Sequence, residues 1–243
     1  MGILLILLMI GRDALIITPE GGKIVHTKVY AAEENVQRID ADIYLDESGS
    51  VLAEVNIQSE GAQYGEHEGI QNTTLKEQEL YYKHDFWKDL NNLEILNMNY
   101  KNNRDSIVFN EDIKVKIPNY TSRAGSKFLF QPNVFNKLTM VPPRYKNRKS
   151  PFVIERGFTD VDTYKIKFSN NLDVEAKTKP VSIRNKFGSY NLTITKTNNI
   201  INYKRELILN KGSYSKEDYQ EFREFFISIN KHDNSKIVFN SKT

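Results

Sequence analysis

The sequence predicts a mainly β protein with two sandwich-like antiparallel domains, each of which carries one sizeable helix. Many short segments alternate apolar and polar residues with a period of two, the pattern of strands with one buried and one solvated face. Turn-forming Gly, Pro and Asn residues separate these segments. Helical patterns are confined to two stretches, one after Thr74 and one after Ser215. Together these three observations define the fold class.

Composition limits the classes of function. The chain has 243 residues, enough for two modest domains or one large β domain, and its 39% hydrophobic content is ordinary for a globular protein. Its 34 basic and 31 acidic residues leave a formal net charge of +3, too balanced to indicate a nucleic-acid partner. It has no cysteine, which excludes disulfides, cysteine-ligated metals and a thiol nucleophile but leaves the compartment open.

The first ten residues are almost wholly apolar. They are too few to span a membrane, which takes about twenty residues. A signal peptide would need a basic segment and a small-residue cleavage site, and neither precedes Arg12. Three interpretations of this segment stay open: a partial signal, a buried strand, or a non-native start to a truncated chain.

Strands and turns account for most of the first half of the chain. Residues 13–25 predict a strand, a Gly-Gly turn and a second strand, and no Lys-Ser/Thr follows to make a phosphate-binding loop. The clearest hairpin joins residues 39–45 to residues 51–57 through a Ser- and Gly-containing turn, with one face buried and one wet. Strands are also predicted near residues 93–100 and 107–117, and Pro118 should end the second of them.

A helix is predicted from the capping box of Thr74 and Glu77 to about Leu90. One face of this helix should carry Leu80, Tyr81, His84 and Trp87. His84 is a candidate catalytic base, but no Cys or Ser partner accompanies it, so a packed or half-exposed histidine is expected.

The residues Glu66, His67 and Glu68 are a second place where acid–base or metal chemistry has to be considered. A paired-histidine zinc helix would need a histidine at position 71, which is Gln71, so that motif is absent. Because glycines punctuate this stretch, we expect a flexible, solvated loop. We therefore predict no catalytic residue, no cofactor and no metal site.

The domain boundary is predicted after Pro142-Pro143. The proposed division is an apolar segment at 1–12, a β-rich domain at 13–143, a linker at 144–151 and a C-terminal β domain at 152–243. The linker contains a dense basic run of Arg144, Lys146, Arg148 and Lys149. A solvated linker is favoured over a phosphate site, because no aromatic or Gly-rich cradle accompanies the run in the sequence.

The C-terminal part alternates through several further strands before it ends in a helix and a last strand. Asn198-Asn199 suits a tight hairpin turn. Ser215 is the expected N-cap of the helix, with Asp218 completing a capping box. The aromatic stripe of this helix should pack on a sheet rather than bind a cofactor; it consists of Tyr219, Phe222, Phe225, Phe226 and Ile229. Residues 236–239 are expected to form an edge strand.

The order and spacing of these C-terminal elements, over about ninety residues, resemble the domain that follows the catalytic core in bacterial transglutaminase-like proteins. The matching pieces are Phe152–Phe158, Asp160–Asp162, Leu172–Glu175, Phe187–Tyr190, Tyr203, Arg205, Gly212–Tyr214, Tyr219, Phe222, Asp233 and Lys236–Val238. Gly11 to Val25 is similar to the segment that leaves the core in that family. Because this likeness starts abruptly at Gly11, a non-native start to a truncated chain is the favoured interpretation of the apolar segment.

The resemblance implies a function, but it supplies no site residues. Transglutaminase-like cores use a Cys nucleophile, a His base and an orienting Asp, and none of these roles can be assigned to a position here. The expectation is a non-catalytic accessory module of an exported, periplasmic protein, without a transmembrane span. Its partner would be such a core or another periplasmic protein, and its mark would be an uncovered apolar patch on the first strands.

Two alternatives are kept. One is a stand-alone extracytoplasmic module that binds an extended peptide or glycan at a sheet edge or on a sandwich face. The other, an independent enzyme, has little support, because the four histidines lie in unlike sequence contexts.

Overall fold

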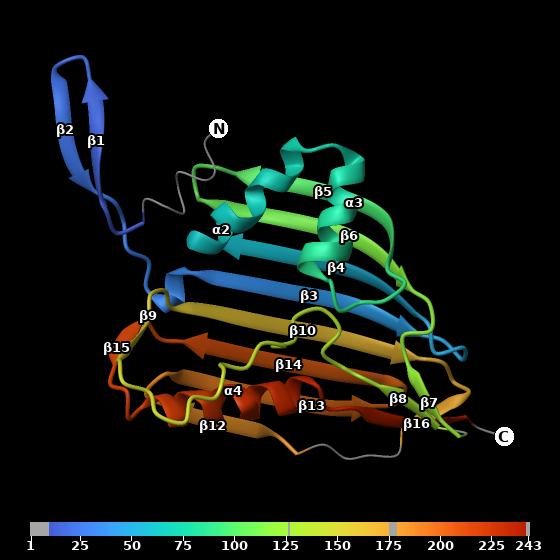
Figure 1. Ribbon diagram of the computed structural model, residues 1–243. Helices are drawn as coiled ribbons and strands as arrows, with labels where there is room; N and C mark the ends of the chain where they lie inside the picture. Colours follow the sequence, from blue (N-terminus) through green and yellow to red (C-terminus); the bar gives the residue numbers. More distant parts are fainter. Residues whose placement is uncertain (1–9, 126, 175–178, 242–243) are drawn as a thin grey trace.

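A computed structural model describes residues 10–125, 127–174 and 179–241 (Figure 1). The protein is mainly β, as predicted, and its largest element is an eight-stranded sheet with the order β12-β13-β14-β10-β3-β4-β6-β5. The strands of this sheet are β3 (Val36–Leu45), β4 (Val51–Glu60), β5 (Glu94–Asn103), β6 (Val108–Ile117), β10 (Phe158–Phe168), β12 (Val181–Asn185), β13 (Gly188–Thr197) and β14 (Ile200–Leu209). The predicted hairpins β3–β4 and β13–β14 are present, and β6 ends just before Pro118.

The eight-stranded sheet contains strands from both sides of the predicted linker. β3 and β10 pair in parallel from Val36 opposite Thr159 to Leu45 opposite Phe168, whereas all other neighbours in the sheet are antiparallel. Residues 131–151, which include the linker, contain no helix or strand. The parallel pair therefore joins the two parts of the chain into one sheet (Figure 1).

One face of this sheet is covered. On β3 the side chains of Ile39, Ile43 and Leu45 point to the covered face and are buried, because apolar residues occupy alternate positions. Figure 1 shows the helices on this side of the sheet. They are α2 (Ala62–His67), α3 (Leu75–Tyr81), the π-type turn η3 (Tyr82–Phe86) and α4 (Tyr219–Asp233). Of the two short 3₁₀ turns, η1 (Ala32–Glu34) precedes β3 and η2 (Glu68–Asn72) follows α2.

Two small sheets complete the structure around this core. The four-stranded sheet has the order β11-β16-β8-β7, formed by β11 (Leu172–Val174), β16 (Ile237–Ser241), β8 (Lys127–Phe130) and β7 (Ser122–Ala124). The prediction of an edge strand at residues 236–239 is wrong, because β16 lies between β11 and β8. β9 (Phe152–Ile154) pairs with β15 (Gly212–Tyr214).

A separate hairpin, β1 (Asp13–Thr18) and β2 (Gly21–His26), extends away from the rest of the molecule (Figure 1). The predicted strand–turn–strand is present, but the predicted Gly-Gly turn is wrong, because Pro19 and Glu20 form the turn and both glycines belong to β2. The expectation for residues 1–12 lies mostly outside the described residues. Within the described part of the chain, no helix has both the length and the apolar character to cross a membrane.

The helix after Thr74 differs from the prediction in length and phase. The capping box is present, with the Thr74 backbone amide donating to Glu77 at 2.8 Å. After Tyr81, however, the turn widens, and the Trp87 amide donates to the Tyr82 carbonyl at 2.9 Å. This five-residue spacing places Tyr82 and Trp87 in the core and leaves His84 exposed, so the predicted apolar face is wrong.

The closing helix also begins later than predicted. Its N-cap is Asp218 rather than Ser215. The Asp218 carboxylate instead accepts hydrogen bonds from the Ser215 amide at 2.9 Å and from the Ser215 hydroxyl at 2.8 Å. These bonds hold a tight turn that precedes the helix, and the expected packing of the aromatic stripe is confirmed for Tyr219, Phe225 and Ile229, which are buried.

A buried ionic network fixes α4 to the sheet. The guanidinium of Arg205 on β14 donates to both carboxylate oxygens of Asp233, at 2.9 and 3.0 Å, and to Asp162 on β10 at 2.7 Å. The Tyr190 hydroxyl also donates to Asp233 at 2.9 Å. Burial raises the pKa of Asp162 to about 7, so its ionised form depends on the donors around it. The network thus links four elements, β10, β13, β14 and α4, through groups that would be costly to leave unpaired.

Replacement of Asp233 by Ala should lower the free energy of unfolding by about 3–5 kcal/mol, because Arg205 and Tyr190 would then lie buried without their acceptor. The matched control is Glu66→Ala, which removes an exposed ion pair with Arg156 and should cost below about 1 kcal/mol. Urea unfolding measures both changes. Equal, small effects would show that the network does not hold the helix.

Candidate functional site

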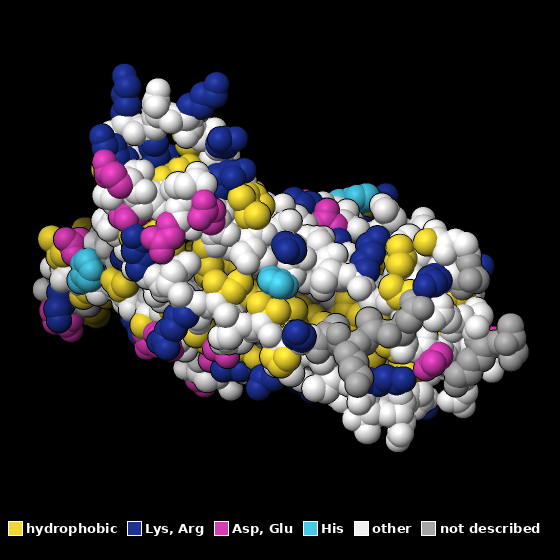
Figure 2. All heavy atoms as spheres, turned by 90° about the horizontal axis from the view of Figure 1, so that it is seen from below, with side chains coloured by type: hydrophobic (Ala, Val, Ile, Leu, Met, Phe, Trp, Pro, Cys, Tyr) yellow, Lys and Arg dark blue, Asp and Glu magenta, His cyan; other side chains and the backbone are white. Residues whose placement is uncertain are grey.

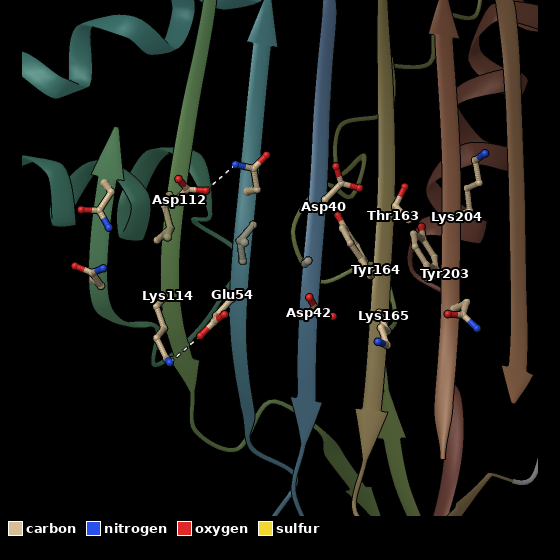
Figure 3. A pocket seen from close by; sticks show the side chains of 17 residues that line it. Asp40, Asp42, Glu54, Asp112, Lys114, Thr163, Tyr164, Lys165, Tyr203 and Lys204 are labelled. Atoms are coloured by element: carbon tan, nitrogen blue, oxygen red, sulfur yellow. Dashed lines mark hydrogen bonds and ion pairs between the residues drawn. The ribbon is translucent and has the colours of Figure 1, made fainter. Parts of the chain in front are cut away.

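The uncovered face of the eight-stranded sheet carries a hollow with a volume of about 670 Å³ (Figure 3). It crosses the middle of six strands, from β14 through β10, β3, β4 and β6 to β5. Figure 3 looks onto this face, with the helices behind the sheet. Alternation along each strand places apolar side chains in the core and polar side chains in the hollow.

Strand register arranges these polar side chains in two rows across the sheet. The first row is Asn202, Lys165, Asp42, Glu54, Lys114 and Asn97. The second row is Lys204, Thr163, Asp40, Asn56, Asp112 and Asn99. We refer to these twelve residues as the polar groove.

Several groups in the polar groove bind one another. Lys114 donates to Glu54 at 2.8 Å, and the amide of Asn56 donates to Asp112 at 2.7 Å, as the dashed lines in Figure 3 mark. By contrast, the described part of the chain holds no hydrogen-bond or ion-pair partner for Asp40 or for Lys204. The groove therefore presents acceptors and donors that are free to bind a polar ligand.

A smaller hollow of about 260 Å³ continues the groove along the strands. It shares Asp42, Glu54 and Lys165 with the larger one and adds Tyr44 and Leu52. The side chains of Tyr44 and Leu52 are 41% and 39% exposed and lie directly opposite each other on β3 and β4. This end of the groove consequently offers an aromatic surface beside the polar rows.

A second candidate surface is the hairpin β1–β2. Leu15, Ile17 and Ile24 lie on one of its faces and are 66%, 84% and 71% exposed. Ile16, on the opposite face, is 45% exposed. A solvated hairpin usually has a polar face, so apolar side chains on both faces are unusual.

The stretch around His67 is not the flexible, solvated loop that the sequence predicts. It forms α2 and η2, and His67 is buried. Gly61 has a φ of 63°, which favours glycine, and a Cβ there would lie 2.4 Å from the Glu34 carbonyl oxygen. The chain can thus pass close to η1 before it enters α2.

A buried polar cluster explains why the His67 side chain is buried. Nδ1 of His67 lies 2.6 Å from Oε1 of Glu111 on β6, and the Tyr82 hydroxyl donates to the other oxygen of that carboxylate. Burial, reinforced by Glu111, raises the pKa of Tyr82, so its hydroxyl stays protonated as a donor. These three residues anchor α2 and η3 to the sheet. The sequence has no cysteine, and within the described residues no Ser side chain is hydrogen-bonded to them.

The other histidines lie on separate elements. His26, in the hairpin, is 2.9 Å from Asp13, and His84 is exposed on η3. His232, on α4, stacks against Tyr190 of β13. The described residues contain no group of three or more His, Asp or Glu arranged to hold a metal ion.

The basic run at residues 144–149 is exposed as expected, apart from Arg148. The structure does bring aromatic rings to it: the Arg148 guanidinium lies 4.3 Å from the ring centroid of Tyr219 and 5.5 Å from that of Phe152. The fold thus brings to Arg148 two rings that lie apart from the run in the sequence. Arg148 also donates to the carbonyls of Ser150 and Pro151, so it serves the packing of this segment.

Figure 2 shows charges of both signs across the face seen from below.

Comparison with known proteins relates the C-terminal half to one family. Residues 126–239 match the family described as "Domain of Unknown Function with solved-structure structure (DUF3858)". This range runs from β8 to β16 and includes the predicted linker. No curated protein matches the chain.

One solved structure, a "putative protease" from Parabacteroides distasonis, is 21% identical over 42% of this chain, with a TM-score of 0.31. The match spans 23% of that protein's length.

Replacement of Glu111 by Ala should lower the free energy of unfolding by about 2–4 kcal/mol, because His67 and Tyr82 would each lose a buried acceptor. Glu94→Ala, which removes an exposed partner of Lys116 on the neighbouring strand β5, is the control and should cost below about 1 kcal/mol. Chemical denaturation compares the two. A Glu111→Ala protein as stable as the control would contradict a structural role for the cluster.

Proposed function

We propose that this chain is a non-catalytic accessory module of a larger, exported protein whose catalytic core is transglutaminase-like. The observation that carries the proposal is the exposed apolar hairpin β1–β2. Residues 13–25 form most of this hairpin. In sequence they are similar to the segment that leaves such a core. The likeness of the C-terminal elements to the domain that follows the core agrees with this assignment.

The physical reason concerns the faces of the hairpin. An isolated two-stranded hairpin is marginally stable in water, and apolar residues on both faces add exposed surface that water disfavours. Strands that are apolar on both faces are typical of sheets that are covered on both sides. The hairpin thus has the character of strands that complete the sheet of a neighbouring domain.

The chemistry of the chain also favours an accessory role. Without cysteine, the sequence supplies no thiol nucleophile for acyl transfer. The one buried histidine that contacts a carboxylate, His67, already shares that carboxylate with Tyr82. Among the described residues, His67 therefore has no free carboxylate partner, which favours a structural role for this histidine.

A second candidate function, binding of an extended peptide or glycan, is favoured by a different observation. The polar groove lies on an uncovered face and contains polar side chains without partners among the described residues. A module can hold a catalytic core at one end and bind a ligand on its sheet, so the two functions are compatible.

The accessory role predicts that the double substitution Leu15→Ser and Ile24→Ser shifts the melting temperature of the isolated chain by less than about 2 °C, because both side chains contact mainly solvent. Ile43→Ser, in the buried face of β3, is the matched control and should cost about 2–5 kcal/mol. The second test uses a longer protein that also contains the transglutaminase-like core, which we expect the DNA before the Met1 codon to encode. In that protein the same double substitution should weaken docking of the hairpin on the core.

Amide hydrogen exchange measures the docking of the hairpin on the core directly. The amides of β1 and β2 should exchange rapidly in the isolated chain and become protected when the core is joined. DNA that encodes no such core, or a hairpin that stays unprotected beside it, would contradict the proposal. So would hydrolysis of an amide or ester by the purified chain that stops when His67 or His84 is replaced.

A further inference from the structure

We propose that the polar groove binds a neutral, linear oligosaccharide laid across the strands of the open sheet face. This inference rests on the second candidate function, ligand binding on the sheet, and does not depend on the accessory role of the hairpin. It commits to one class of ligand because the length, the charge and the hydrogen-bonding groups of the groove favour that class.

The dimensions of the polar groove suit a chain molecule. Six strands at a spacing of about 4.8 Å give each row a length of about 24 Å, and the two rows lie about 7 Å apart along the strands. A single small molecule would occupy a fraction of this length. Several sugar units in a row would contact both rows along the whole groove.

The charge of the groove favours a neutral ligand. Its four carboxylates, on Asp40, Asp42, Glu54 and Asp112, are nearly balanced by three ammonium groups. Asp40 and Asp42 lie at the centre, on β3, where they would repel a phosphate or an acidic polymer. Two of the ammonium groups, on Lys165 and Lys204, lie on β10 and β14 and would disfavour a strongly basic peptide.

The hydrogen-bonding groups suit sugar hydroxyls. A hydroxyl group both donates and accepts, so it can bind a carboxylate, an ammonium or an amide equally well. Amides from Asn97, Asn99 and Asn202 lie at the two ends of the groove, and free carboxylates lie between them. Tyr44, at the adjoining hollow, adds an exposed ring on which the apolar face of a sugar can stack.

A peptide fits this place less well. Extended peptides bind sheets mainly by adding a strand to an edge, through free backbone groups. The five inner strands that cross the groove have neighbours on both sides, so their backbone groups are already paired. Only the outer edge of β5 lies open at one end. A ligand in the polar groove would therefore be bound by side chains and not by backbone groups.

Isothermal titration of the full chain with neutral oligosaccharides tests the inference. The probes are β-1,4-linked glucose, β-1,4-linked N-acetylglucosamine and α-1,4-linked glucose chains of two to six units. We expect at least one series to bind, with affinity that rises with chain length. The isosteric change Asp40→Asn and the change Tyr44→Ala should each weaken binding at least tenfold. The control Ser182→Ala, on the outer strand β12 of the same face, should leave affinity unchanged.

Three results would overturn the inference: no binding of any series at millimolar concentration, binding that Asp40→Asn and Tyr44→Ala leave intact, or groove-dependent binding of unstructured peptides in place of glycans. Circular dichroism of each variant confirms that it is folded. Failure of glycan binding would leave the docking of the hairpin on a core untouched, because that docking is measured by hydrogen exchange at β1 and β2.

Discussion

The parallel pairing of β3 with β10 is the constraint on which the rest of the structure depends. It joins the hairpin strands β3 and β4 to the C-terminal strands β10, β13 and β14, so that one sheet passes through both parts of the chain. Parallel strands cannot be joined by a tight turn, and here the intervening chain supplies α2, α3 and the strands β7 and β8 of the four-stranded sheet. A single continuous core results, with Ile43 and Tyr164 buried on the two paired strands.

The helices and loops cover one face of the eight-stranded sheet, so its other face is accessible to a ligand. Helices, loops and small sheets from both parts of the chain are packed on the same side, where aromatic residues and two buried polar clusters fix them. Arg205 pairs with Asp162 and Asp233, and Glu111 accepts from Tyr82 beside His67, so each cluster links a strand to a covering element. These buried titratable groups therefore hold the covering elements on the sheet. Accessible polar groups line the open face, and accessible apolar groups lie on the hairpin.

Local rules in the sequence predicted the strands well and their assembly poorly. Period-two alternation located β3 and β4, and the Thr74–Glu77 capping box located the start of α3, because these signals act between near neighbours. The burial of His67 depends on Glu111, 44 residues away, which no local pattern reveals. Asp40 and Asp42 were recognisable as solvated positions of a strand. Their convergence with Asn56, Lys165 and Lys204 required the order of the strands, which depends on the β3–β10 pair.

We expect the whole sheet and the core beneath it to unfold as one cooperative unit. Differential scanning calorimetry of the intact chain should show a single transition in which the calorimetric and van't Hoff enthalpies agree. Residues 13–143 expressed alone should show no such transition, because β3 would lose its neighbour β10. Two separate transitions in the intact chain, with one retained in that fragment, would contradict the continuous sheet and favour two independent domains.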